Sequence, residues 1–165
     1  MYIDNNNGSL SGHGIPVMQQ PLFDELKTCY PILRWAGGKR WLKPNLDKYL
    51  PKDGFNNYHE PFVGGAAILL HLRPQKAYIS DLNSGLINAY KAVRDHPHEL
   101  ISFLKEFKNI EEEYYKIRKI EFDDEIQEAA RFIYLNYASF NGIFRVNLKG
   151  EYNVPYGKRI GVIYY

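Results

Sequence analysis

Two adjacent glycines, Gly64 and Gly65, stand between a short strand-like run at 58–63 and the apolar start of a helix. Glycines after a strand let a ligand approach the backbone, and the free N–H groups of the following helix then face that ligand. Asp81 follows 17 residues after Gly64, where an acidic side chain can accept hydrogen bonds from both hydroxyls of a ribose. The pattern predicts an adenosine-type ligand, and a glycine turn beside a helix-capping Asp is an equally simple structural explanation.

A second glycine pair lies in the stretch RWAGGKR at 34–40, where Trp35 and Lys39 bracket the two glycines. This stretch lacks the spacing and the Ser/Thr of a phosphate-binding loop, and the turn at Gly64 lacks the third glycine of a dinucleotide fingerprint. The sequence therefore disfavours kinases and dehydrogenases. Trp35 and Lys39 are candidates for ligand binding, with a core tryptophan and a solvated lysine as the alternative.

A third candidate region begins near residue 135 and is rich in Asn, Arg, Lys and Tyr. Such side chains contact phosphates and read base edges in the major groove of DNA, which admits a two-stranded ribbon. A polar surface hairpin without a ligand fits the same composition.

The elements that must position these residues follow from the periodicity. Strand-like runs at 58–63 and 77–80 alternate with a helix after each, which implies an α/β fold with a parallel sheet. Asn83 or Ser84 can cap the second of these helices. A further helix is expected from about 124 to 137, and a tight hairpin is expected around Lys149-Gly150.

Composition limits the classes of protein to which the chain can belong. The chain has 165 residues with 45% hydrophobic and 24% charged content, which is typical of one globular domain. Cys29 has no partner cysteine, and no apolar run reaches membrane-spanning length, so we expect a cytoplasmic protein with no membrane and no metal partner. Residues 1–30 lack a sustained period and are predicted to be a flexible leader.

Charge is distributed unevenly along the chain. The net charge is +2, but residues 31–52 carry six basic side chains against one acid. Residues 99–128 carry ten acids and five bases, and leucines and other apolar residues recur beneath them at helical spacing. We interpret this acidic stretch as a solvated helical face.

Four motifs in one order resemble the Dam-type family of DNA adenine methyltransferases over roughly residues 31–158. They are RWAGGKR, HEPFVGGAA, SDLN and LNYASFNGIFRVNLKGEYNVPYG. The resemblance implies an α/β fold with a partial Rossmann-like methyltransferase sheet and a helical and hairpin DNA-recognition subdomain. It implies S-adenosylmethionine as cofactor, double-stranded DNA as partner, and a restriction-modification or related role; the family's target is often GATC.

The same resemblance implies roles for particular residues. The cofactor would be bound by Trp35, Lys39, Glu60, Phe62, Gly64, Gly65, Asp81 and Leu82. DNA would be contacted by Arg34, Asn141, Ile143, Arg145, Lys149, Pro155 and Lys158. The corresponding division is a leader at 1–30, a cofactor-binding portion at 31–94, a target-recognition subdomain at 95–158 and an atypical end at 159–165.

The family's catalytic tetrapeptide, Asp-Pro-Pro-Tyr, does not occur in these 165 residues, and neither does any Pro-Pro pair. The nearest string is Asn153-Val154-Pro155-Tyr156, which we reject because it lies in the DNA-facing hairpin and because Val154 does not fix the backbone as proline does. We therefore expect an N-terminal portion of an adenine methyltransferase that is inactive alone and has no catalytic residue. Two alternatives remain: one half of a methyltransferase split over two chains, and a non-enzymatic remnant or regulator that binds S-adenosylmethionine, DNA or a partner chain.

Overall fold

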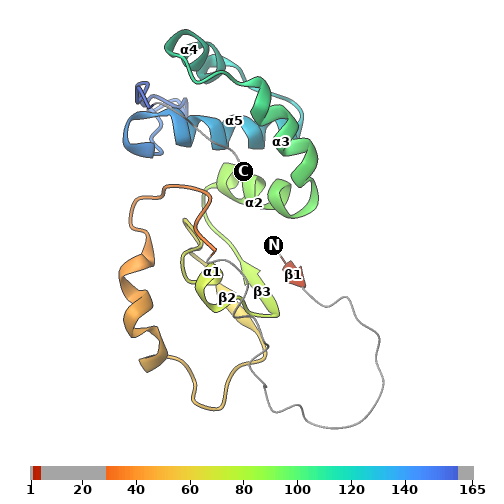
Figure 1. The fold of residues 1–165 in the computed structure, drawn as a ribbon, viewed down its shortest axis with the longest axis vertical. Coiled ribbons are helices and arrows are strands. Elements are labelled where there is room, and N and C mark those ends of the chain that lie inside the picture. Colours follow the sequence, from red (N-terminus) through yellow and green to blue (C-terminus); the bar gives the residue numbers. More distant parts are fainter. Residues whose placement is uncertain (1, 5–28, 160–165) are drawn as a thin grey trace.

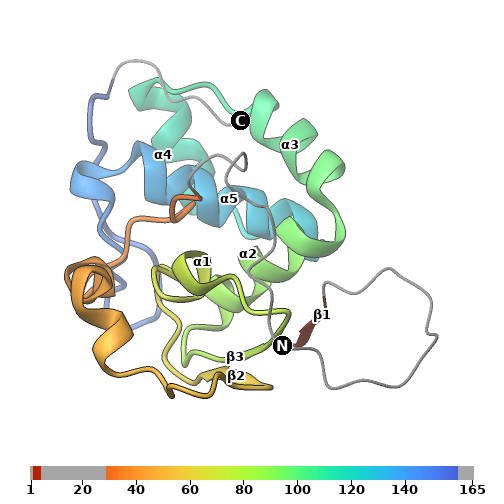
Figure 2. The ribbon, with the colours of Figure 1, turned by 60° about the horizontal axis from the view of Figure 1, so that its bottom comes forward.

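The computed structural model describes residues 2–4 and 29–159, which form a helical half and a half built around a small sheet (Figure 1). Figure 2 shows the same arrangement from a second direction, in which the helix at 84–95 lies between the helix at 125–138 and the sheet. The helical half contains α2 (Ser84–Asp95), α3 (Pro97–Glu106), α4 (Glu111–Lys119) and α5 (Glu125–Ala138). The other half contains the 3-10 helix η1 (Lys39–Lys48), the short helix α1 (Leu69–Leu72) and the sheet.

The sheet has three strands in the order β1-β3-β2. β2 (Tyr58–Glu60) and β3 (Lys76–Ile79) are parallel, with Tyr58 opposite Ala77, and α1 lies between them in the chain. This parallel pair with a helical crossover confirms the predicted α/β class.

The third strand, β1 (Tyr2–Asp4), pairs antiparallel with β3. These three residues fall within the predicted flexible leader at 1–30, and they form a strand that the sequence pattern did not predict. A three-residue strand is too short to leave a periodic pattern, and its partner in the sheet lies more than 70 positions away. The remainder of the predicted leader, residues 5–28, lies outside the described residues, as does 160–165.

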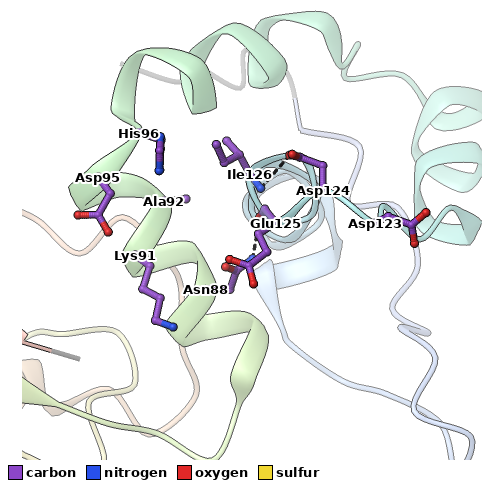
Figure 3. Close-up of a pocket in the computed structure, with 9 residues that line it drawn as sticks. All are labelled: Asn88, Lys91, Ala92, Asp95, His96, Asp123, Asp124, Glu125 and Ile126. Carbon is purple, nitrogen blue, oxygen red and sulfur yellow. Dashed lines mark hydrogen bonds between the residues drawn. The ribbon is translucent and has the colours of Figure 1, made fainter.

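Two helix starts follow directly from capping chemistry. The Asn83 side chain accepts a hydrogen bond from the Leu86 N–H at 2.9 Å, so α2 begins where the sequence predicted. Asp124 accepts from the N–H groups of Ile126 and Gln127 and caps α5 in the same way, as Figure 3 shows for Ile126. α5 spans Glu125–Ala138, within one residue of the prediction.

The acidic stretch at 99–128 does not form one helix. α3 ends at Glu106, and α4 begins at Glu111 after an extended connection. Leu100 and Leu104 bury the inner face of α3, while the acids stay on the outer faces. The predicted solvated face is present, and it is divided between separate helices.

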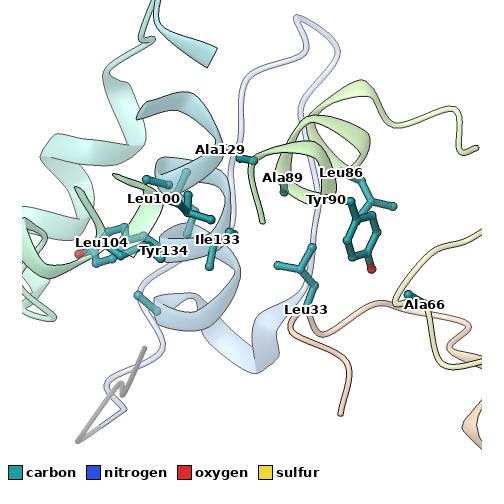
Figure 4. Close-up of a cluster of buried hydrophobic side chains, with 14 of the residues drawn as sticks. Leu33, Ala66, Leu86, Ala89, Tyr90, Leu100, Leu104, Ala129, Ile133 and Tyr134 are labelled. Carbon is teal, nitrogen blue, oxygen red and sulfur yellow. The ribbon is translucent and has the colours of Figure 1, made fainter. Parts of the chain in front are cut away.

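α5 forms the centre of the core and packs against α2, α3 and α4 (Figure 4). Its Ala129 and Ala130 are fully buried, which lets neighbouring helices approach closely. Leu33 and Ala66 from the sheet half join the same apolar cluster, so the two predicted portions of the chain share one core. Within the described residues, no helix is both long enough and apolar enough to cross a membrane.

The predicted hairpin is present but is held by few backbone bonds. Asn147 N–H donates to the Glu151 carbonyl at 2.9 Å, and Gly150 N–H donates to the Asn147 carbonyl at 3.0 Å. Gly150 has a φ of +83°, which glycine adopts without steric cost. The turn therefore spans Asn147–Gly150, and Val146 and Tyr152 form an isolated bridge beyond it.

Candidate cofactor and nucleic-acid site

The glycine turn after β2 is fixed from two sides. Gly64 N–H donates to the Asp81 carboxylate at 3.0 Å, and the Gly64 carbonyl accepts from the hydroxyl of Tyr90 at 2.7 Å. The second oxygen of Asp81 accepts from the Asn83 N–H at 3.1 Å. The end of β3 and helix α2 therefore both hold the turn, which places the predicted acid directly beside the predicted glycine.

Trp35 lies against both glycines of this turn. A Cβ added to Gly64 would lie 3.0 Å from Trp35 Cδ1, and one added to Gly65 would lie 3.4 Å from Trp35 Cβ. Gly64 also has a φ of +48°, a conformation that side-chain-bearing residues rarely adopt. The requirement for glycine here comes from the close approach of the indole as well as from the backbone.

Lys39 connects the segment after Trp35 to the same turn. Its ammonium donates to the Phe62 carbonyl at 2.6 Å and lies 3.5 Å from the buried carboxylate of Glu60. Glu60 in turn accepts from the Tyr58 hydroxyl at 2.8 Å. Burial and the Glu60 carboxylate raise the pKa of Tyr58 well above its usual value, so this hydroxyl remains a donor.

These segments surround a cavity of about 190 Å³, which we call the glycine cavity. Its lining is Trp35, Ala36, Gly37, Gly38, Lys39, Phe62, Val63, Gly64, Gly65, Ala67 and Asp81. Ligand pockets usually enclose about 300–1,000 Å³, so this cavity matches part of a nucleoside-sized ligand.

Six of the eight predicted cofactor residues line the glycine cavity, and two do not. Glu60 is 7% exposed and does not reach the cavity surface, and its carboxylate pairs with Lys39, which does. Leu82 is 97% exposed and is absent from the lining. The structure therefore brings together the residues of three separate motifs, while Glu60 and Leu82 are not on the cavity surface.

A larger cavity of about 450 Å³ lies between α2 and α5, and we call it the helical cavity (Figure 3). Two of its polar groups have partners within the protein: the Asn88 amide donates to the Glu125 carbonyl, and Asp124 caps α5. The remaining lining is Lys91, Ala92, Asp95, His96, Asp123 and Ile126. Within the described residues, no group of His, Cys, Asp or Glu is arranged to hold a metal ion.

All seven predicted DNA-contacting side chains are exposed: Arg34, Asn141, Ile143, Arg145, Lys149, Pro155 and Lys158. Asn141 and Lys158 have φ values of +55° and +53°, in the left-handed region that non-glycine residues rarely adopt. Such backbone outliers concentrate at functional sites. The Arg145 guanidinium donates to the Asn153 side-chain oxygen at 2.7 Å and to its carbonyl at 3.2 Å, which fixes its orientation.

The string Asn153-Val154-Pro155-Tyr156 has little free polar capacity. The Asn153 oxygens accept from Arg145, and the Val154 carbonyl accepts from the Tyr114 hydroxyl at 2.8 Å and from Arg118 at 3.0 Å. Val154 itself is buried. The Val154 carbonyl is therefore fully occupied by two donors, and the Asn153 side-chain oxygen already accepts one bond from Arg145.

Asn136 is a positioning residue that sequence reasoning missed. It is 2% exposed, accepts from the Arg34 N–H at 2.9 Å, and donates to the carbonyls of Arg34 and Gly142. It thereby joins the start of RWAGGKR to the turn after α5. A polar side chain among the apolar residues of α5 was the available signal, since buried amides need partners.

Comparison with known proteins gives related matches. Residues 35–161 match the family model described as D12 class N6 adenine-specific DNA methyltransferase. The type II methyltransferase M1.LlaDCHI of Lactococcus lactis subsp. cremoris is 42% identical over 136 residues, covering 78% of this chain and 48% of that protein. The DNA adenine methylase of Escherichia coli strain K12 is 37% identical over 134 residues, covering 77% of this chain and 47% of that protein. The chain thus spans about half the length of these curated relatives.

Proposed function

The chain belongs to the D12 class of N6 adenine-specific DNA methyltransferases, and we propose that it binds S-adenosylmethionine at the glycine cavity and duplex DNA at the hairpin, for methylation of the adenine N6 amine. One observation carries the proposal: residues from 35–39 and 62–67, together with Asp81, belong to three family motifs and converge on one cavity. We further propose that β2 and β3 belong to a Rossmann-like methyltransferase sheet and that residues 95–158 form the recognition subdomain.

The residues of the glycine cavity fit the adenosine part of this cofactor. Each oxygen of Asp81 accepts one backbone hydrogen bond, and an ionised carboxylate has about four acceptor positions. Capacity therefore remains for the two hydroxyls of a ribose. Lys39 contributes positive charge at the lining, which favours the carboxylate of the methionine part. When bound, the cofactor supplies an electrophilic methyl group on a sulfonium.

The hairpin and the adjoining turn supply the proposed DNA contacts. Arg145 is held by Asn153 through two of its N–H groups, and a guanidinium has five donors in all. Its remaining donors suit base-edge or phosphate acceptors. We expect duplex binding to weaken with salt by a slope of about one per phosphate contact. Arg145→Ala should also reduce sequence discrimination by about 1–3 kcal/mol if this side chain reads a base.

We propose that this 165-residue chain alone transfers no methyl group. The amine of adenine needs acceptors for its hydrogens in the transition state, and the fully occupied Val154 carbonyl supports our rejection of that string as the catalytic motif. A segment with Asp-Pro-Pro-Tyr, supplied in trans or by fusion, should restore transfer. Adenine methylation by the chain alone that is lost in Asn153→Ala would contradict this proposal.

Calorimetry with S-adenosylhomocysteine tests the cofactor half of the proposal. We expect weak binding by the wild type and none by Asp81→Ala. Asp124→Ala is the matched control, because Asp124 also accepts two backbone N–H groups but caps α5 away from the glycine cavity. Absence of heat with the wild type, or equal heat with Asp81→Ala, would overturn the assignment.

A further inference from the structure

The strongest concentration of positive charge lies outside the hairpin, in η1 and the turn that follows it. Residues 39–52 carry five basic side chains and one acid, Asp47, a local net charge of +4. The whole chain carries +2, so all other residues together carry −2. Lys39 belongs to the glycine cavity, which leaves four bases in this segment without a role in the proposed function.

Three of these bases are exposed and lack acidic partners. Arg40, Lys48 and Lys52 lie on the surface, and none forms an ion pair in the part of the chain that the structure describes. Lys48 contacts a neutral acceptor, the side-chain oxygen of Asn45, at 2.7 Å. Together with Trp41 and Tyr49 these three residues form what we call the η1 surface.

The aromatic members of the η1 surface are unusually exposed. Trp41 is 74% exposed and Tyr49 is 73% exposed. Clustered basic side chains are the electrostatic footprint of nucleic-acid binding, and an exposed Tyr hydroxyl such as that of Tyr49 can donate to a duplex phosphate.

The η1 surface is continuous with the proposed DNA face. Arg34 is bound by Asn136 and packs so closely on Gly142 that an added Cβ there would lie 2.5 Å from Arg34 Cδ. Trp35 stacks on Phe144 of the hairpin, with ring centroids 5.4 Å apart and planes 24° apart. η1 begins four residues later, so the hairpin fixes the point from which η1 extends.

The arrangement of charge also gives the molecule two unlike sides. In Figures 1 and 2 η1 and the segment after α5 lie on the same side of the molecule. The helix ends that form the acidic helical cavity lie at the opposite side in Figure 1. A polyanion would therefore be attracted to the side that carries both η1 and the hairpin.

We propose that Arg40, Lys48 and Lys52 bind backbone phosphates of duplex DNA that flanks the stretch contacted by the hairpin. This inference rests on the proposed function, because it extends the same DNA footprint. The footprint of the chain is then longer than the recognised sequence, and the η1 contacts are independent of base sequence.

The test is duplex binding over a range of salt, with a short duplex and a long duplex of the same central sequence. The triple variant Arg40→Ala, Lys48→Ala, Lys52→Ala should lower the salt slope by about 2–3 on the long duplex, close to 0.9 per phosphate lost, and leave the short duplex almost unchanged. The matched control is Lys91→Ala, Lys105→Ala, Lys116→Ala, which removes the same charge from exposed positions of α2, α3 and α4. We expect this control to bind both duplexes like the wild type.

The outcomes separate this inference from the proposed function. Equal salt slopes for the two triple variants, or equal losses on short and long duplexes, would overturn the η1 contacts alone. Failure of the wild type to bind any duplex would overturn both. Retained S-adenosylhomocysteine binding by the η1 variant should accompany the expected result, since none of its three residues lines the glycine cavity.

Discussion

The glycine cavity and the helical cavity differ in kind, and the smaller of the two has the features of a ligand site. The helical cavity is more than twice as large, about 450 Å³ against about 190 Å³, but its capping carboxylate and amide are already bonded within the protein. The glycine cavity is lined by exposed backbone, an indole, an ammonium and a carboxylate from three separate segments. Volume therefore does not locate the site, whereas the convergence of backbone, aromatic and charged groups from three separate segments does.

The largest expected loss of cofactor affinity comes from substituting Gly64, a residue of the glycine cavity with no counterpart in the helical cavity. In Gly64→Ala the new methyl group meets Trp35 at 3.0 Å and the backbone is held at a φ of +48°. We expect S-adenosylhomocysteine binding to fall by more than about tenfold, a loss of more than about 1.4 kcal/mol, because the methyl group displaces the Trp35 indole that lines the cavity. The left-handed alanine separately costs roughly 1–2 kcal/mol of stability. Calorimetry measures the loss.

Gly150→Ala is the control for this variant. Gly150 has a φ of +83°, but nothing lies within 4 Å of an added Cβ. It should lose similar stability and keep the cofactor affinity. Equal affinities for Gly64→Ala and the wild type would remove the steric basis of the glycine cavity.

The next largest effect is a loss of folding stability at alkaline pH, because tyrosine hydroxyls with raised pKa values support the glycine cavity. Burial raises the pKa of Tyr58 and Tyr90 above the usual value of 10.0, with Glu60 contributing to both. Below pH 10 both the folded and the unfolded chain keep these protons, and above it only the unfolded chain releases them. Stability should therefore be intact below pH 10 and should fall above it, by about 1.4 kcal/mol per pH unit for each such tyrosine.

Urea unfolding on both sides of pH 10 checks this expectation. Tyr90→Phe should make the alkaline fall shallower by the share of one tyrosine. A fall that begins well below pH 10, or one that Tyr90→Phe leaves unchanged, would contradict it.

A smaller loss of cofactor affinity is expected when the hydroxyl of Tyr90 is removed. Tyr90→Phe removes the bond to the Gly64 carbonyl and should weaken S-adenosylhomocysteine binding by about threefold to tenfold, since such a bond contributes about 0.5–1.5 kcal/mol. Tyr134→Phe is the control, because its buried hydroxyl donates to the Lys108 carbonyl away from the cavity. If both variants bind equally well, Tyr90 has only a structural role.

The smallest effect is expected at the helical cavity. Lys91→Ala and Asp95→Ala change its charge, and neither should alter cofactor affinity, because this cavity lies outside the proposed site. A clear loss of S-adenosylhomocysteine binding in either variant would reverse the comparison between the two cavities.

Local sequence patterns predicted the structural features that are determined by a few neighbouring residues. The glycine turn, the Asn83 cap and the apolar period of α5 are each written in a few neighbouring residues, and the structure contains all three. β1 was missed because its pairing is long-range and its length is three residues. Tyr90 and Asn136 were missed as positioning groups for a similar reason: their partners, Gly64 and Arg34, lie 26 and 102 positions away.

The resemblance to the family predicted more of the residues that line the glycine cavity than periodicity did, and two of its proposed cofactor residues, Glu60 and Leu82, lie off that lining. Leu82 directly follows Asp81, which does line the cavity. On a strand or its continuation, neighbouring side chains point to opposite faces, so adjacency in a motif does not guarantee a place on the cavity surface.

Nuclear magnetic resonance of the isotopically labelled chain, titrated with S-adenosylhomocysteine, tests the central claim most directly. The two tryptophans give separate indole signals, one from Trp35 in the glycine cavity and one from exposed Trp41. We predict that the Trp35 indole and the backbone amides of Gly38, Gly64 and Gly65 shift and saturate together. Shifts confined to residues 88–96 and 123–126 of the helical cavity, or no shifts at all, would contradict the account.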